Sequence, residues 1–249
     1  MGMLGHLEKQ SDEKEIKYRH EYKFLCNEAE WTLLKSRIAP MMQPDPHAGE
    51  KGFYEIRSIY FDDIYDTCYY KNETGVDPRA KYRIRCYNGL DDVIKLEKKI
   101  KKQQKTRKLS ARLTKEQYEL ILAGAYGEVM AGLSAESEED SLIRELCVLG
   151  LTRRMTAKVI VSYERYPFVE RAGNVRITFD KNIASGVDYA GFFDKNPVRC
   201  PVLQTGMHLL EVKYDEFLPA YLKEALENGR LRQTTFSKYY ICRQKRKVK

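Results

Sequence analysis

The chain has 249 residues, of which 43% are hydrophobic, so it is long enough to bury one large core. Its 44 Lys and Arg against 36 Asp and Glu give a formal net charge of +8, which favours anionic partners without choosing among phosphates, nucleic acid and membrane surfaces. No stretch approaches the roughly 18 apolar residues of a membrane span, and residues 1–10 lack the apolar core of a signal peptide, so we expect a cytoplasmic protein with no membrane segment.

The N-terminal part of the chain is predicted to contain a strand followed by a helix. Residues 1–15 are polar and lack a periodic apolar pattern, so we expect a flexible terminus. Residues 18–26 are predicted to form a strand. Asn27 with Glu30 makes a capping-box pattern at the start of an amphipathic segment, which predicts a helix through Ile38.

A β-hairpin is the clearest local signal in the next part of the chain. Residues 40–52 contain three prolines and two glycines and are predicted to form a loop, while the aromatic and β-branched residues 54–61 are predicted to form a strand. Two segments with charges at every second position, 79–87 and 93–101, then flank Asn88-Gly89. An Asn-Gly pair between two such segments is typical of the tight turn of a hairpin.

Helices interrupt the predicted strands in the middle of the chain. Thr114 with Gln117 caps a helix through Leu122, and a second helix is expected over about residues 138–149, behind an acidic run that suits a helix N-terminus. Three strands are expected next, over residues 157–168, 175–180 and 207–214, and a short helix after them over residues 219–228.

The simplest architecture for these elements is an α+β domain dominated by an antiparallel sheet. We expect one domain over residues 16–241, and the basic residues 242–249 are predicted to form a loose tail. The six cysteines include no C-x-x-C pair and are expected to be reduced and mostly buried. The four histidines lack the ligand spacing of a zinc site.

The predicted strands carry their charges on one face. Because side chains alternate across a strand, Lys81, Arg83 and Arg85 share one face, and Tyr82 and Ile84 share the other. The same alternation groups charged residues in three other strands: Glu21 with Lys23; Lys95 and Glu97 with Lys99; and Glu211 with Lys213.

Alternation of this kind usually marks the solvent-facing side of a half-buried antiparallel strand. A solvated face, however, tends to avoid like charges as near neighbours, because they repel each other. Three cations in line become favourable when a polyanion lies among them, and arginine forks suit phosphate oxygens. If the sheet closes, the charged face becomes the lumen of a phosphate-binding tunnel. The chain has no P-loop motif and no RNP-like aromatic motif, which argues against a P-loop ATPase and against generic RNA binding.

Seven short strings of residues point to a known family. They are EYK at 21–23, KYRIR at 81–85, LEKK at 96–99, YER at 163–165, VRITFD at 175–180, LEVK at 210–213 and FSKY at 236–239. Together, and in this order, they closely resemble the catalytic domain of the vacuolar transporter chaperone (VTC) family, the polyphosphate polymerases of the triphosphate tunnel metalloenzyme superfamily. The resemblance implies an antiparallel β-barrel, the triphosphate tunnel fold, flanked by helices.

The resemblance also implies which residues form the site. The residues expected to act catalytically are Arg83, Arg85, Lys99, Arg165 and Lys238. Contacts with the phosphate chain or with the triphosphate of a nucleotide are expected from these five and from Lys23, Lys81, Tyr163, Arg176, Lys213 and Ser237. Ser237 and Lys238 belong to a motif that the family places on its last strand. Glu211 is implied to hold the metal, Mn²⁺ or Mg²⁺, with Glu97 as a second candidate.

The implied function is a polyphosphate polymerase that transfers the γ-phosphoryl group of ATP to a growing chain of inorganic polyphosphate. Its expected partners are ATP and polyphosphate, without nucleic acid, and the oligomeric state stays open. Two alternatives remain: a hydrolase of tripolyphosphate or nucleoside triphosphates on the same fold, and a polyphosphate-binding module without catalysis. Related tunnel hydrolases carry E-x-E-x-K on the first strand, whereas this chain has Arg19 at the first glutamate, which argues against the hydrolase. Thr235 stands where some family members have a further lysine.

Overall fold

The computed structural model describes residues 19–102, 105–227 and 229–247. The strands within them are β1 (His20–Asn27), β2 (Gln43–Pro44), β3 (Tyr54–Asp62), β4 (Arg79–Tyr87), β5 (Leu90–Lys102), β6 (Lys105–Leu113), β7 (Thr156–Glu170), β8 (Val175–Gly186), β9 (Cys200–Pro201) and β10 (Met207–Tyr214). They form one antiparallel sheet in the order β1-β10-β8-β7-β3-β4-β5-β6, with β2 paired to β7 and β9 paired to β8. The expected flexible terminus over residues 1–15 lies outside the described residues.

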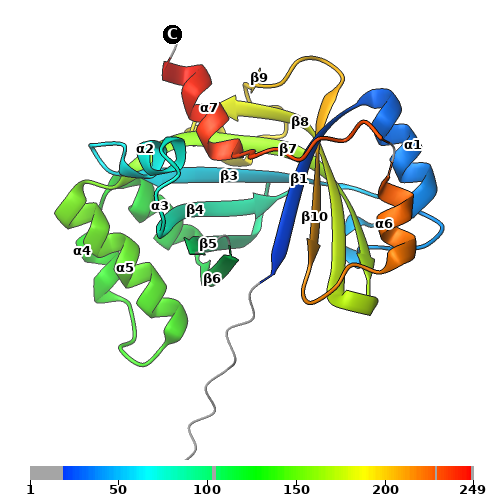
Figure 1. Cartoon of the computed structure of the whole chain (residues 1–249). Helices are drawn as coiled ribbons and strands as arrows, with labels where there is room; N and C mark the ends of the chain where they lie inside the picture. The colour runs from blue at the N-terminus through cyan, green and yellow to red at the C-terminus, as the bar shows by residue number, and fades with distance from the viewer. Residues whose placement is uncertain (1–18, 103–104, 228, 248–249) are drawn as a thin grey trace, which may run out of the picture.

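The sheet curls so that its two ends approach each other (Figure 1). β1 and β6 are the last strands of the path, and a bridge between Arg19 and Thr106 joins them. No continuous ladder connects β1 to β6 in the described residues, so the barrel is not closed by backbone hydrogen bonds. The predicted α+β architecture, with an antiparallel barrel-like sheet flanked by helices, is confirmed.

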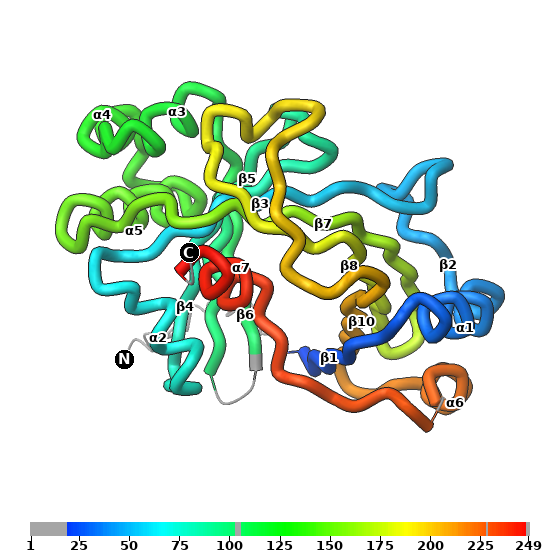
Figure 2. The backbone as a smooth tube through the Cα atoms, turned by 90° about the horizontal axis from the view of Figure 1, so that it is seen from above, coloured from blue at the N-terminus to red at the C-terminus, as the bar shows by residue number. Residues whose placement is uncertain are grey.

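Two groups of helices cover the outside of the curled sheet (Figure 1). The helices are α1 (Glu28–Ile38), α2 (Thr67–Glu73), α3 (Lys115–Ala123), α4 (Tyr126–Ala131), α5 (Glu138–Arg153), α6 (Ala220–Leu226) and α7 (Lys238–Lys247). Three short 3-10 turns are η1 (Pro46–Ala48), η2 (Ala172–Asn174) and η3 (Ala190–Phe193). Seen from above, α3, α4 and α5 lie at one side of the sheet and α1 with α6 at the other, while α7 lies between them (Figure 2).

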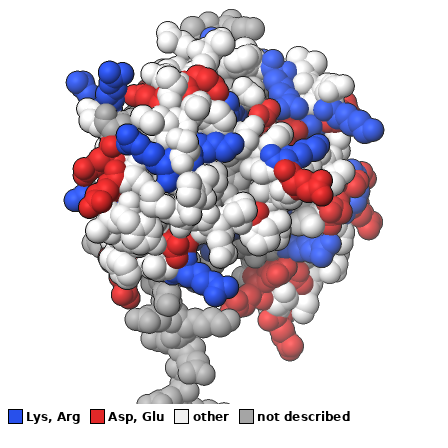
Figure 3. Space-filling view, turned by 90° about the vertical axis from the view of Figure 1, so that its right-hand side faces the viewer, with Lys and Arg blue, Asp and Glu red and all other residues white. Residues whose placement is uncertain are grey.

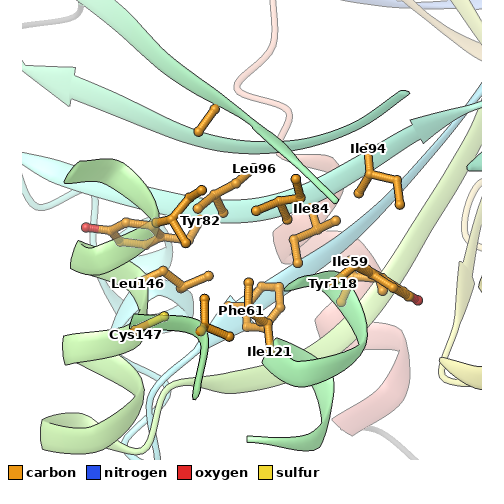
Figure 4. Packing of buried hydrophobic residues seen from close by; sticks show 14 of the residues in the cluster. Ile59, Phe61, Tyr82, Ile84, Ile94, Leu96, Tyr118, Ile121, Leu146 and Cys147 are labelled. Carbon is orange, nitrogen blue, oxygen red and sulfur yellow. The ribbon is translucent and has the colours of Figure 1, made fainter. Parts of the chain in front are cut away.

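The hydrophobic core decides which face of each strand turns outward. One cluster packs the outer face of β3 to β6 against α3, α4 and α5, and includes the fully buried Ile59, Ile84 and Leu96 (Figure 4). Burial of each such side chain stabilises the fold by about 1.5–3 kcal/mol. A second cluster packs β1, β10 and β8 against α1 and α6, and includes Leu34 and Leu222. The opposite face of the same strands is therefore left to the interior of the curl.

The predicted caps and the predicted turn are confirmed. The Asn27 side chain accepts a hydrogen bond from the backbone N–H of Glu30, and the Glu30 carboxylate accepts one from that of Asn27, both at 2.9 Å. Thr114 caps α3 in the same reciprocal way with Gln117. Asn88 and Gly89 both have positive φ, 53° and 67°, as the tight hairpin turn between β4 and β5 requires.

The C-terminal end of the chain differs from the prediction. Residues 243–247 are not a loose tail but belong to α7, whereas residues 248 and 249 lie outside the described residues. The helix is held because Arg243 and Lys247 form ion pairs of 2.6 and 2.8 Å with Asp66, next to α2. The hydroxyl of Tyr239 also donates a hydrogen bond of 2.5 Å to the buried Asp62. Ser237 and Lys238 accordingly lie at the start of this helix and not on a last strand.

Two further helices, α2 and α4, and three strands, β6 and the two-residue β2 and β9, lie where none was predicted. α2 begins without a cap at its own N-terminal residue, and its first N–H groups are satisfied from the end of β3. The Asp62 carboxylate accepts hydrogen bonds from the backbone of Cys68 and Tyr69, and Asp63 accepts one from that of Thr67. Because Asp62 lies six and seven residues before the N–H groups that it caps, the sequence does not show the capping pattern that would predict this helix.

The cysteines and the helix lengths agree with the composition. All six cysteines are free, and five of them are buried. Within the described residues, every helix is too short or too polar to cross a membrane.

Candidate functional site

The cations of β4 point into the curl of the sheet. Tyr82 and Ile84 lie in the cluster beneath α3 and α5 (Figure 4), so Lys81, Arg83 and Arg85 face the other way. These side chains are therefore turned towards the interior of the curled sheet and do not cover its outer surface. The inward-facing charged side chains fall into three clusters, built around Glu97, around Glu211 with Asp180, and around Glu21, and Lys81 stands apart from them.

The first cluster surrounds Glu97 on β5, whose side chain is 0% exposed. Arg83 donates a charge-assisted bond of 2.7 Å to it from Nε, and Nη2 of Arg83 lies 2.7 Å from the same oxygen. Lys108 donates a bond of 2.8 Å, and Arg85 lies 3.6 Å away. Burial raises the pKa of Glu97, but the charges of Arg83, Arg85 and Lys108 outweigh burial and leave the pKa below its ordinary value. Arg83 also donates to the hydroxyl of Tyr60 at 2.8 Å.

The second cluster joins β7, β8, β10 and α7. Lys238 lies 2.7 Å from Glu211 and 2.5 Å from Asp180, and Arg165 holds Asp180 through two bonds of 2.7 and 2.8 Å. Lys213 contacts Glu211 at 2.6 Å. Burial alone would raise the pKa of both carboxyl groups, but these neighbouring cations lower it in each case.

Tyr163 links the first two clusters. Its hydroxyl accepts a long bond of 3.4 Å from Arg85, and its ring packs against Arg165 and Lys238. Burial raises the pKa of Tyr163, yet the three cations reverse this effect and the pKa is lowered. A phenol that becomes more acidic inside a protein reports a positive local potential.

The third cluster surrounds Glu21 on β1. Lys99 lies 2.9 Å from Glu21, and Lys23 lies 3.2 Å from it and donates to the backbone carbonyl of Phe236 at 2.8 Å. Burial lowers the pKa of Lys99 to about 8; Glu21 opposes this shift, while Lys23 and Lys213 add to it. Lys99 therefore sits among more positive charge than its one carboxylate neutralises.

Lys81 is held by neutral groups. Its ammonium donates to the side chains of Asn72 and of Ser237, the latter at 2.8 Å. Burial, followed by the charges of Lys23 and Lys99, lowers its pKa well below the ordinary value. Ser237 thus touches the predicted site from the start of α7, and its oxygen also accepts the backbone N–H of Tyr240.

Arg176 is the one predicted residue whose contacts lead elsewhere in the described part of the chain. Its guanidinium donates to Asp45 at 2.7 Å and to the hydroxyl of Tyr54 at 2.9 Å. Arg19, which stands at the position of the missing glutamate, pairs with Asp215 at 2.7 Å. The other predicted site residues are brought together from β1, β4, β5, β7, β10 and α7.

Three residues of these clusters were not predicted as site residues: Glu21, Lys108 and Asp180. Asp180 carries the clearest unused signal, because it follows Arg176 and Thr178 at alternate positions and hence shares their face of β8. Lys108 lies on β6, a strand that was not predicted, so its position could not be anticipated.

Positive charge exceeds negative charge in the interior. In the described part of the chain, the three clusters together with Lys81 contain nine cations and four carboxylates. The cations are Lys23, Lys81, Arg83, Arg85, Lys99, Lys108, Arg165, Lys213 and Lys238, and the carboxylates are Glu21, Glu97, Asp180 and Glu211. The outer face seen in Figure 3 instead carries both signs interspersed. The interior is thus the part of the molecule best suited to a polyanion.

The carboxylates fit a metal that is bound mainly by a phosphate ligand. The described residues contain no group of three or more His, Cys, Asp or Glu side chains arranged around one point. Mg²⁺ sites for phosphate substrates typically use only one or two carboxylates, and phosphate oxygens and water complete the coordination. Glu211 and Asp180, which both contact the ammonium group of Lys238, offer such a donor set.

The family model of the VTC domain matches residues 18–246. Comparison with curated proteins gives no match.

Solved structures share the fold. A candidate adenylyl cyclase from Hippeastrum that reveals a dominant triphosphatase activity is similar with a TM-score of 0.55 and 12% identity, over 92% of this chain and 96% of that chain. A candidate adenylate cyclase from Bacillus halodurans is similar with a TM-score of 0.50 and 16% identity, over 89% of this chain and 94% of that chain. These similarities confirm the predicted triphosphate tunnel fold.

Proposed function

The chain belongs to the VTC domain family, and from this premise we propose that it is a metal-dependent polyphosphate polymerase. It transfers the γ-phosphoryl group of ATP to the end of a polyphosphate chain held among the inward-facing cations. The observation that carries the proposal is the excess of nine cations over four carboxylates, drawn from many separate strands onto one enclosed face.

The reaction needs alignment and charge stabilisation more than acid–base chemistry. A terminal phosphate oxygen of polyphosphate attacks the γ-phosphorus, the new P–O bond forms, and the bond to the oxygen between the β- and γ-phosphorus breaks. That oxygen leaves on ADP with the bonding electrons. The attacking oxygen is already anionic, so no base has to remove a proton.

The side chains of the site have matching roles. Arg83, Arg85 and Arg165 present planar forks suited to two phosphate oxygens at once. Lys99 and Lys238 act as point charges beside the transferring group. A well-placed donor of this kind contributes about 3 kcal/mol of transition-state stabilisation.

Phosphate must exchange places with the carboxylates that these cations now contact. Glu97 and Glu211 are released from part of their ion pairs as phosphate oxygens enter, and Glu211 is then the proposed ligand for Mg²⁺ or Mn²⁺. The bound metal would neutralise charge on the bridged phosphate oxygens.

The electrostatics of the carboxylates favour transfer to phosphate over hydrolysis. A hydrolase of tripolyphosphate or nucleoside triphosphates on the same fold is the second candidate, and the triphosphatase activity of the Hippeastrum protein supports it. Water, however, benefits from a base with a pKa near the working pH. The pKa values of Glu21, Glu97, Asp180 and Glu211 are all lowered, which makes each a weak base.

Two neighbouring lysines give a matched test. Lys99 faces the interior, while Lys98 lies on the outer face and pairs with Glu145. Wild type incubated with ATP and Mn²⁺ should form polyphosphate, seen as a ladder on a stained gel. Lys99→Met should lower the rate by about 100-fold or more. Lys98→Met should leave the rate nearly unchanged, because Lys98 points away from the interior and its partly exposed pair with Glu145 contributes about 1 kcal/mol to stability and nothing to phosphate binding.

The alternatives predict different results in the same assay. Release of inorganic phosphate without chains would establish the hydrolase. Binding of tripolyphosphate without any product would establish a module that only binds polyphosphate. Equal loss of activity in both lysine variants would contradict the assignment of Lys99.

A further inference from the structure

Three pairs of like charges stand directly opposite each other on β4 and β5. The register places Arg79 across from Lys101, Lys81 across from Lys99 and Arg85 across from Lys95, whereas Arg83 stands across from the carboxylate of Glu97. Like charges directly opposite each other destabilise a sheet, so the three cationic pairs are retained at a cost to the fold. Two of them, the inner pair of Lys81 with Lys99 and the outer pair of Arg79 with Lys101, are neighbours along the two strands.

The outer of these pairs is the less compensated. Lys99 of the inner pair contacts Glu21, but in the described residues neither Arg79 nor Lys101 forms an ion pair with a carboxylate. Among the described residues, Arg79 donates to the backbone carbonyl of Val76. Burial, then Arg79 and Lys23, lower the pKa of Lys101, and the more distant charges of Glu21 and Asp77 act in the opposite direction without reversing the shift.

These residues continue the line of inward-facing cations. Arg79 is two residues before Lys81 on β4, and Lys101 is two residues after Lys99 on β5, so all four side chains share one face. Each such step advances about 7 Å along the strand. The line runs away from the Glu97 cluster towards the start of β4 and the end of β5, which lie beside the start of β1 (Figure 2).

We infer that Arg79 and Lys101 form a further phosphate subsite at the end of this line, which holds polyphosphate chains that extend beyond the triphosphate bound by the inner cations. The inference rests on the proposed function. A short ligand occupies the inner pair and the three clusters. A longer chain continues along the same face and reaches the outer pair as it leaves the interior.

The test compares two ligands on one double variant. Arg79→Gln with Lys101→Gln should weaken binding of long-chain polyphosphate about tenfold at low salt, while the affinity for tripolyphosphate changes less than about twofold. The slope of log affinity for the long chain against log salt concentration should become shallower by roughly one for each removed cation. Both affinities are measured by titration calorimetry on the full chain.

A single substitution guards against loss of the fold. Lys101→Glu places opposite charges across the strands, which favours the sheet, and should still weaken long-chain binding selectively. As a control for net charge, Lys51→Gln with Lys195→Gln removes two exposed lysines elsewhere and should leave both affinities unchanged.

The outcomes separate this inference from the proposed function. Unchanged long-chain affinity in the Arg79 and Lys101 double variant, or an equal loss for both ligands, would overturn the subsite. A wild-type protein that binds neither ligand would overturn the proposed function, and the subsite with it.

Discussion

Substitution of Glu97 by Gln should destabilise the free protein and strengthen its binding of phosphate. Glu97 is fully buried and neutralises Arg83 and part of Arg85. Breaking a buried ion pair costs about 3–5 kcal/mol, because the remaining charge stays buried without a partner. Arg83 keeps its bond to Tyr60 and Arg85 keeps its bond to Ser58, so we expect the lower end, about 3 kcal/mol.

A bound triphosphate should recover part of this loss. In the wild type the ligand has to displace Glu97 from Arg83, whereas in Glu97→Gln the cations are already available. If the dissociation constant falls tenfold, saturating ligand returns about 1.4 kcal/mol more stability to the variant than to the wild type. The two free energies of unfolding should therefore converge as tripolyphosphate is added.

Urea unfolding at low salt, with and without tripolyphosphate, measures both quantities. A loss of 3 kcal/mol corresponds to a melting temperature lower by about 6–12 °C for a chain of this length. Glu145→Gln is the control, since its pair with Lys98 is partly exposed on the outer face and should contribute no more than about 1 kcal/mol. A Glu97→Gln protein as stable as the wild type, or one whose deficit tripolyphosphate does not reduce, would refute the reasoning.

Four other outcomes follow from the same structure. Affinity for tripolyphosphate should be highest below about pH 8 and fall as the pH rises above it. In the ligand-free protein Lys99 loses its proton in this range, whereas in the complex the bound polyanion keeps Lys99 protonated; calorimetry in two buffers should therefore show proton uptake on binding. The lowered carboxyl pKa values, such as that of Asp180, contribute stability that is complete above about pH 4–5, the unfolded range, and is lost as the pH falls further, which acid titration followed by circular dichroism should show. Chelation of divalent metal with EDTA should abolish polyphosphate synthesis while tripolyphosphate binding stays measurable by calorimetry. Leu96→Ala should cost about 2–5 kcal/mol in urea unfolding, because Leu96 is fully buried beneath α3 and α5.

Alternation and capping patterns predicted most of the fold. The hairpin of β4 and β5 and both capping boxes were read from neighbouring residues, because the interactions that form them are local. The order of the strands in the sheet is a different matter. The pairing of β1 with β10 joins residues that are almost two hundred positions apart, and no local pattern encodes it.

Most cations that the structure brings together in the candidate site were proposed from the sequence, but fewer of the carboxylates beside them. Arg83, Arg85 and Lys81 are recognisable in the sequence, because like charges at alternate positions of a strand are unusual. Asp180 gives a weaker signal: it alternates with Arg176 and Thr178 on β8, but its role becomes clear only when Arg165 and Lys238 are seen beside it. Which carboxylate neutralises which cation depends on how the sheet curls, and therefore on the three-dimensional structure.

The position of α7 has a consequence for how the protein would respond to proteolysis. This helix brings Lys238 and Ser237 to the interior, and the segment before it runs along β1, where the Thr234 N–H donates to the carbonyl of Lys23 at 2.8 Å. Asp66 clamps the far end of the same helix. A proteolytic cut in the connecting segment, followed by dissociation of α7, would remove two proposed phosphate contacts in one event. It would also uncover the buried cluster that Tyr239 and Cys242 complete, so loss of activity and loss of stability would come together.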